Sequence, residues 1–122
     1  MRAVLDSDIL VDYLQGLDKA KREIERYSQP EISIISWMEI MTGADNPAEE
    51  KSCRDFLSRF FVHQLSIDIA TEAVAVRKKY RIRLPDAIIW ATARANGCLL
   101  VTRNTKDFST KEPEIRVPYR VT

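Results

Sequence analysis

Four acidic residues stand at positions where together they could bind a metal ion. Each comes at the end of an expected strand or at the start of an expected helix. They are Asp6 after the apolar run 3–5, Glu39 just past the expected strand 31–35, Asp86 opening an expected helix, and Asp107 a few residues beyond the apolar run 98–101. Because the carboxyl ends of parallel strands lie at one edge of a sheet, we expect these acids at that edge.

Carboxylates gathered in a partly dry pocket favour a divalent cation. Without one, burial and mutual repulsion make the ionised forms costly, unless some of the acids take up protons. A site with only oxygen ligands suits Mg²⁺, with Mn²⁺ as a substitute, better than zinc. The single histidine, His63, lies away from the acids in the sequence, and neither Cys53 nor Cys98 is beside them. We therefore expect a magnesium site.

Each acid also has a structural interpretation. Asp6 could cap the helix that follows it, although Asp8 is better placed for that role and could otherwise support the site. Asp86 could serve only to compensate the positive end of a helix dipole. Glu39 stands three residues after Ser36, which is the spacing of a capping box. Local spacing alone leaves both interpretations open for each acid.

Short apolar runs alternate with helical patterns along the whole chain. The expected strands are 3–5, 31–35, 62–65, 98–101 and 115–117. Helical patterns fill the segments between them, with caps or first turns expected at Asp18, Ser36, Asn46, Asp68 and Pro85. Strands separated by helices predict a parallel sheet covered on both faces. We expect one domain over residues 1–122, an α/β fold that forms a three-layer α/β/α sandwich around a central parallel sheet of about five strands.

Composition and charge limit the class of protein. The chain has 122 residues, and its 19 basic and 18 acidic residues give a net charge of +1, which excludes a generic polycation. Two cysteines without paired spacing predict packed, reduced thiols. An acid interrupts the N-terminal segment before a signal-peptide core could form, and no apolar run approaches the roughly 20 residues of a membrane span. We expect a cytoplasmic protein with no membrane contact.

In the positions of these acids the sequence resembles the PIN-domain nucleases, and among them the VapC-type toxins of toxin-antitoxin pairs. The resemblance covers nearly the whole chain through four ordered motifs. These are Leu-Asp-Ser-Asp at 5–8, Ser-Trp-Met-Glu-Ile-Met-Thr-Gly-Ala at 36–44, Leu-Pro-Asp-Ala-Ile-Ile-Trp-Ala-Thr-Ala at 84–93, and Leu-Val-Thr-Arg-Asn-Thr-Lys-Asp-Phe at 100–108. The resemblance implies a PIN-like fold, Mg²⁺-dependent cleavage of RNA, a homodimer, and inhibition by a cognate antitoxin.

The resemblance also implies roles for particular residues. It implies that Asp6, Glu39 and Asp86 form the acidic, metal-binding core and that the hydroxyls of Ser7 and Thr102 support it.

The last metal ligand is open between two residues. The family often places an acid two residues after the threonine, where this chain has Asn104, whereas a subset uses a later acid, here Asp107. An amide oxygen can bind Mg²⁺ but adds no negative charge.

A basic rim must offset the repulsion between an acidic pocket and RNA. The candidates for phosphate contact are Arg77, Lys78, Lys79, Arg81, Arg83, Arg103 and Lys106. The run at 77–83 could equally be a solvated helix end that is favourable to the dipole.

Two other functions compete with the nuclease. The pair Asp6 and Asp8 after an apolar strand is similar to the nucleophile motif of haloacid-dehalogenase-type phosphatases, although no acid pair follows Thr102 at a later strand end. A module with a PIN fold that binds RNA or protein but does not cleave is the other alternative, and Asn104 is the feature that supports it.

Overall fold

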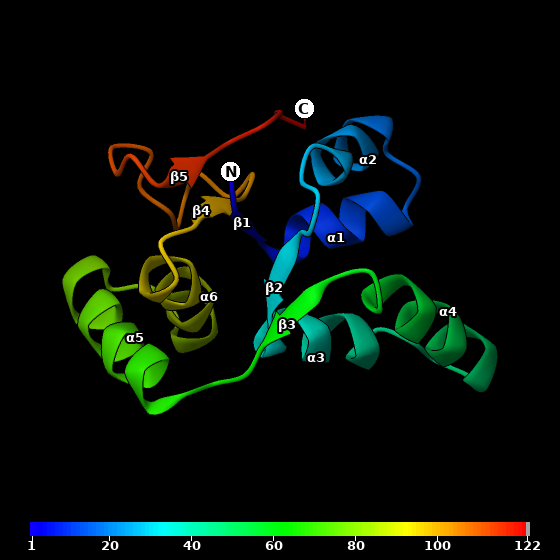
Figure 1. Ribbon diagram of the computed structural model, residues 1–122, viewed down its shortest axis with the longest axis horizontal. Coiled ribbons are helices and arrows are strands. Elements are labelled where there is room, and N and C mark those ends of the chain that lie inside the picture. The colour runs from blue at the N-terminus through cyan, green and yellow to red at the C-terminus, as the bar shows by residue number, and fades with distance from the viewer. Residues whose placement is uncertain (122) are drawn as a thin grey trace.

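A five-stranded parallel sheet forms the centre of the computed structural model, which describes residues 1–121 (Figure 1). In space the strands follow the order β3-β2-β1-β4-β5, so β1 lies in the middle. The strands are β1 (Ala3–Leu5), β2 (Glu31–Ser33), β3 (Phe61–His63), β4 (Leu99–Val101) and β5 (Ile115–Arg116). Leu5 pairs with Val101 in the register of β1 and β4, which sets the residues that follow them side by side.

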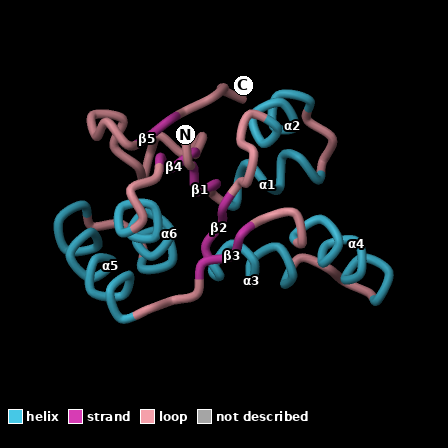
Figure 2. The backbone as a smooth tube through the Cα atoms, in the orientation of Figure 1, coloured by secondary structure: helices cyan, strands magenta, loops and turns pink. Residues whose placement is uncertain are grey.

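Helices cover both faces of this sheet (Figure 2). They are α1 (Ser7–Leu14), α2 (Asp18–Glu25), α3 (Ile34–Thr42), α4 (Pro47–Leu57), α5 (Ile67–Tyr80) and α6 (Leu84–Ala95). One core cluster joins Ala3 and Leu5 to buried residues of α1 to α4, and a second joins Val4 to buried residues of α5 and α6. Successive side chains of β1 therefore point to opposite faces, as the period of two in a strand requires. The three-layer sandwich expected from the sequence is confirmed.

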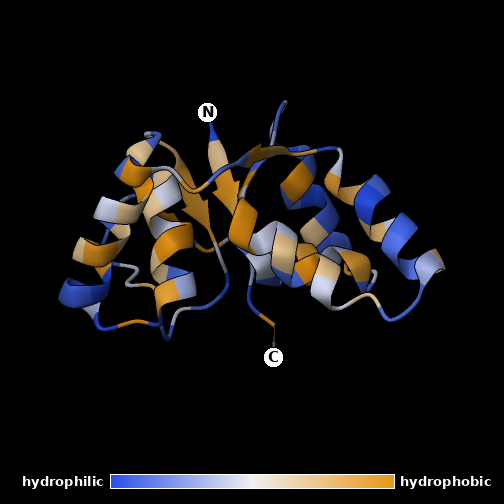
Figure 3. Ribbon diagram, turned by 90° about the horizontal axis from the view of Figure 1, so that it is seen from below, coloured by the Kyte–Doolittle hydropathy of each residue, from blue (hydrophilic) through white to orange (hydrophobic). Residues whose placement is uncertain are grey.

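Apolar residues are concentrated on the strands and on the helix faces that meet them (Figure 3). Trp90 and Phe108 are fully buried, and their rings meet edge to face with centroids 5.6 Å apart. Phe108 thereby anchors the loop that follows β4 against α6. Within residues 1–121, none of the helices combines the length and the apolar character needed to cross a bilayer.

The start of α3 differs from the sequence prediction. Ser33 caps this helix, because its Oγ accepts the N–H of Ile35 (3.0 Å), and Ser36 lies buried inside the helix. A short apolar pair such as Ile34 and Ile35 fits a strand or a helix equally well by pattern, so β2 is shorter than expected. The capping-box interpretation of Glu39 is therefore wrong.

Two further boundaries move by one or two residues. β3 begins at Phe61, whose N–H donates to the carbonyl of Pro30 (3.0 Å), so the third strand is 61–63 rather than 62–65. α5 begins at Ile67 and is capped by Ser66, whose Oγ accepts the N–H of Ile69 (3.2 Å). Neither shift alters the order of the elements.

Candidate active site

Asp6 lies at the carboxyl end of the central strand, where α1 begins. Its backbone N–H donates to the carbonyl of Val101 (2.8 Å), and its Oδ1 accepts the N–H of Ser7 (2.7 Å). Its Oδ2 accepts the hydroxyl of Thr102 (2.8 Å), the residue that follows β4. Only 5% of Asp6 is exposed. Asp6 stands at the expected edge of the sheet and, contrary to expectation, it rather than Asp8 caps α1.

Asp8, in the first turn of α1, brings a second carboxylate beside Asp6. Its Oδ2 accepts the backbone N–H of Arg103 (3.2 Å) and lies 3.4 Å from Thr102 Oγ1. Its Oδ1 is buried and has no hydrogen-bond partner within residues 1–121. Burial and the charge of Asp8 raise the pKa of Asp6 to about 8, and burial raises the pKa of Asp8. An added cation would be stabilised beside this pair.

Glu39 reaches the same edge from α3 through a contact with Ser7. Ser7 Oγ donates to Glu39 Oε1 (2.7 Å) and lies 2.9 Å from Ser36 Oγ. The parallel register of β1 and β2, with Val4 opposite Glu31, brings the start of α3 beside the start of α1. Glu39 itself is exposed, so its carboxylate can rotate without disturbing the core.

Asp86 is held at this edge by the first turn of α6 and is only 8% exposed. The Nε of Arg83 lies 3.4 Å from Asp86 Oδ2, with most of the arginine side chain in solvent. Burial raises the pKa of Asp86, the charge of Arg83 opposes the rise, and the negative charges of Asp107 and Glu39 add to it. The charges of Asp107 and Glu39 therefore act on Asp86 in the same direction as its burial.

The loop after β4 distinguishes Asn104 from Asp107. Asn104 Oδ1 accepts the backbone N–H groups of Lys106 and Asp107 at 3.2 Å each, and its Nδ2 donates to Asp107 Oδ2 (2.9 Å). The amide of Asn104 is therefore used to shape the loop. Asp107 Oδ1 has no hydrogen bond among the residues that the structure describes, whereas both polar atoms of the Asn104 side chain are engaged.

The donors at this edge fit a hard divalent cation in kind. They are the carboxylate oxygens of Asp6, Asp8, Glu39, Asp86 and Asp107, and one of them, Asp8 Oδ1, is buried and has no partner in the part of the chain that the structure describes. As the side chains are placed, however, no three His, Cys, Asp or Glu residues within 1–121 are gathered closely enough to hold a metal ion. Binding would require Glu39 and Asp86 to turn toward Asp6.

The sequence did not predict a buried cluster one turn further along α1, formed by Asp12, Arg103 and Tyr119. Arg103 Nε and Nη2 donate to the two oxygens of Asp12 (2.6 and 3.0 Å), and the Tyr119 hydroxyl donates to Asp12 Oδ2 (2.8 Å). This cluster fixes Arg103, whose N–H contacts Asp8. The only sequence signal is that Asp12 follows Asp8 by one helical turn, which puts both acids on one face of α1.

The predicted basic rim is brought only partly to the site. Arg83 contacts Asp86, but Arg103 is engaged by Asp12 and Arg77 Nη1 donates to the carbonyl of Ile82 (2.9 Å). The remaining members are exposed and lie on α5, just after it, or on the loop after β4. They are Lys78, Lys79, Arg81 and Lys106.

Comparisons with known proteins agree with this fold. The PIN domain family matches residues 3–112. A chain in the toxin-antitoxin complex from Klebsiella pneumoniae is 43% identical, with a TM-score of 0.91 over 98% of this chain and 99% of that one. A chain of VapBC2 from Rickettsia felis, solved with a DNA fragment from their promoter, is 24% identical (TM-score 0.79, 94% and 96% covered). A chain of FitAcB from Neisseria gonorrhoeae is 17% identical (TM-score 0.81, 98% and 99% covered). A comparison with curated protein sequences gave no match.

Proposed function

This chain belongs to the PIN-domain family, and from that premise we propose that it is a Mg²⁺-dependent endoribonuclease, the VapC-type toxin of a toxin-antitoxin pair. The observation that carries the proposal is the pair of acids at the carboxyl edge, the buried Asp6 and the half-buried Asp8, with Asp8 Oδ1 buried and without a partner within residues 1–121. Buried carboxylates of this kind are stabilised when a cation joins them.

Four acids would hold the cation: Asp6, Glu39, Asp86 and Asp107. Mn²⁺ could take the place of Mg²⁺, because both prefer oxygen ligands. The metal, when bound, supplies a water of lowered pKa and stabilises negative charge on the phosphate and the leaving oxygen.

The other residues of the site orient these acids. Thr102 fixes one oxygen of Asp6 through its hydroxyl, and the N–H of Ser7 fixes the other. Ser7 Oγ holds Glu39 near the start of α1. Arg83 offsets part of the negative charge that Asp86 presents to an incoming phosphate.

A protein partner and a second copy of the chain belong to the proposal. The relative from Klebsiella pneumoniae was solved as a toxin-antitoxin complex, which supports a cognate antitoxin here. Exposed apolar side chains on the adjoining helices α1 and α3, among them Leu14 and Met38, support additional protein contacts such as a homodimer. Light scattering of the purified chain, alone and with the antitoxin, tests both.

The phosphatase alternative is not favoured. Phosphatases of that type would need a further pair of acids at a strand end after Thr102, whereas β5, the strand that comes after Thr102 in the chain, is followed by Val117 and Pro118. The other alternative, a PIN-fold module that binds RNA or protein without cleaving, differs from the nuclease in having no activity. Cleavage assays therefore separate the two.

The test is cleavage of tRNA, ribosomal RNA and messenger fragments by the purified protein with Mg²⁺ or with EDTA. We expect cleavage only with Mg²⁺, and at least about 100-fold less with Asp86→Asn, since even residues that merely orient metal ligands contribute 10–100-fold. Full Mg²⁺-dependent cleavage by Asp86→Asn would contradict the proposal.

A further inference from the structure

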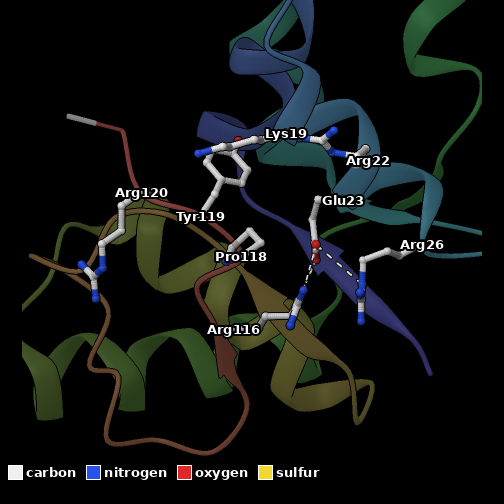
Figure 4. Close-up of a pocket in the computed structure, with 8 residues that line it drawn as sticks. All are labelled: Lys19, Arg22, Glu23, Arg26, Arg116, Pro118, Tyr119 and Arg120. Atoms are coloured by element: carbon white, nitrogen blue, oxygen red, sulfur yellow. Dashed lines mark hydrogen bonds and ion pairs between the residues drawn. The ribbon is translucent and has the colours of Figure 1, made fainter.

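A hollow of about 460 Å³ lies between α2, β5 and the segment that follows β5 (Figure 4). It is separate from the acidic edge described above. Its lining is formed by Lys19, Arg22, Glu23, Arg26, Arg116, Pro118, Tyr119 and Arg120. We call this hollow the basic pocket.

Five of the eight lining residues are cations and one is an anion, in a chain whose formal net charge is only +1. Lys19, Arg22 and Arg120 make no side-chain hydrogen bond or ion pair within residues 1–121, and all three are exposed. Gathering like charges in a concave surface raises its positive potential. The basic pocket is therefore a place where an anion would be attracted.

The one acid of the pocket, Glu23, is already occupied and holds its neighbours in place. Arg116 donates Nε and Nη2 to its two oxygens (2.8 and 2.9 Å), and the Tyr27 hydroxyl donates to Oε2 (2.7 Å). Arg26 lies 3.6 Å away. Burial alone would raise the pKa of Glu23, but these contacts outweigh it and lower the pKa. Glu23 accepts only from Nε and Nη2 of Arg116, so the Nη1 group of Arg116 can donate to a bound ligand.

The sheet connects the basic pocket to the acidic edge. Arg116 pairs with Val101 in the register of β4 and β5, and the N–H of Thr102 donates to the carbonyl of Arg116 (3.0 Å). Tyr119, which lines the pocket, donates to Asp12, and Asp12 holds Arg103 beside the acids. The pocket and Asp6 are thus placed relative to each other by direct contacts between rigid elements.

We propose that the basic pocket binds backbone phosphate of the RNA substrate on the β5 side of the acidic edge, an inference that rests on the proposed ribonuclease function. Phosphate suits it because guanidinium groups hold phosphate oxygens through paired N–H donors. An acidic protein segment fits less well, because an RNA strand carries a negative charge on every nucleotide and can contact together the three pocket cations that are unpaired within residues 1–121. The RNA path then crosses α2 and β5 rather than the basic run 77–83.

The experiment compares two triple variants with equal loss of charge. The pocket variant carries Lys19→Gln, Arg22→Gln and Arg120→Gln, all at exposed positions outside the core. The control variant carries Lys21→Gln, Arg54→Gln and Lys111→Gln, which are exposed and do not line the pocket. Both variants are expected to have the same melting temperature as the wild type. Fluorescence anisotropy with a labelled single-stranded RNA in EDTA, at several salt concentrations, measures binding without cleavage.

We expect the pocket variant to bind RNA about tenfold or more weakly and to lose about 2 units of the slope of log affinity against log salt, because each phosphate contact contributes about 0.7. The control variant should stay close to wild type. Equal losses in the two variants, or no RNA binding by the wild type, would overturn the inference. Unchanged RNA affinity with weakened binding of poly-glutamate would assign the pocket to an acidic protein and also overturn it. A third outcome separates the two proposals. If the pocket variant loses RNA binding but the wild type shows no Mg²⁺-dependent cleavage, RNA binding at the pocket is supported and the ribonuclease function is refuted.

Discussion

Buried acids lie at both edges of the sheet, and their surroundings differ. At the amino edge, Glu31 accepts Nε and Nη2 of Arg2 (2.9 and 2.8 Å), and His63 Nε2 lies 2.6 Å from its Oε1. Burial alone would raise the pKa of Glu31, but these contacts outweigh it and lower the pKa. At the carboxyl edge, no basic side chain within residues 1–121 pairs with Asp6, and burial with the charge of Asp8 raises its pKa to about 8.

The difference separates two uses of a buried carboxylate. Glu31, paired with Arg2 and His63, links β2 to β3 and to the segment before β1. These basic partners stabilise its charge without any added ion. An acid that has only neutral donors and another acid beside it is poorly stabilised in the folded protein. The carboxyl edge is therefore where the fold retains a charge that a cation could balance.

The largest expected effect is that of Asp6→Asn on catalysis. We expect RNA cleavage to fall by more than about 100-fold, because a ligand should matter more than the 10–100-fold of a residue that orients one. The free energy of unfolding in EDTA at pH 8 should stay the same or rise, because the amide keeps the cap acceptor and removes a buried charge. Rates and urea unfolding measure the two effects.

The matched control for Asp6→Asn is Glu31→Gln. It should lower the free energy of unfolding, because Arg2 and His63 lose their charged partner, and leave cleavage per folded molecule intact. The comparison of the two edges fails if the variants change activity and stability in the same way.

A smaller effect is expected of Thr102→Val, which keeps the size of the side chain and removes the hydroxyl that Asp6 Oδ2 accepts. Mn²⁺ affinity and cleavage should fall 10–100-fold. Thr92→Val is the control, since Thr92 is also buried and its Oγ1 donates to the carbonyl of Ile88 (2.8 Å). It should cost about 1 kcal/mol of stability and no activity. Equal loss of activity in both variants would mean that Thr102 acts only through folding.

A further variant pair tests the loop after β4. Asp107→Asn should reduce Mn²⁺ affinity about tenfold, because it removes a charge near Asp86 while keeping an acceptor for Asn104 Nδ2. Asn104→Ala should reduce it only a few-fold, through a looser loop. Titration of both variants with Mn²⁺ measures the difference. A larger loss from Asn104→Ala would make the amide the ligand.

The last expected effect is on the pH dependence of stability in EDTA. The folded pKa of Asp6 lies above its ordinary 3.8, so the folded state binds more protons between that value and about 8, and stability should fall as pH rises through this window. Asp6→Asn should flatten that slope. The pKa of Glu31 is lowered, so its contribution is present above the ordinary value and lost as pH falls through the folded one. Glu31→Gln should therefore change only the acidic side of the curve.

The sequence predicted the fold and the acidic edge because both depend on local patterns. An apolar run followed at once by a polar residue, as at Leu5 and Asp6 or Val101 and Thr102, indicates the end of a buried strand. Parallel topology then places such ends together. Start positions of helices were less predictable. The apolar pair after Ser33 fits the end of a strand as well as the start of a helix, and the structure has it in α3.

Long-range pairings could not be predicted. Asp12 meets Arg103 and Tyr119 across 91 and 107 positions of the chain, and the two partners of Glu31 are 29 and 32 positions away. No pattern of one sequence specifies which of its many arginines is brought to which acid. The same limit applies to the basic pocket, whose cations come from α2 and the residue after it, from β5, and from the segment that follows β5.

Calorimetric titration with Mn²⁺ tests the central claim most directly, because it needs no knowledge of the RNA target. We predict that the wild type and Glu31→Gln bind Mn²⁺ with the same affinity and that Asp6→Asn and Asp86→Asn lose most of that binding. Failure of the wild type to take up Mn²⁺, or uptake that is unchanged in both Asp variants, would contradict the assignment of the carboxyl edge as a metal site.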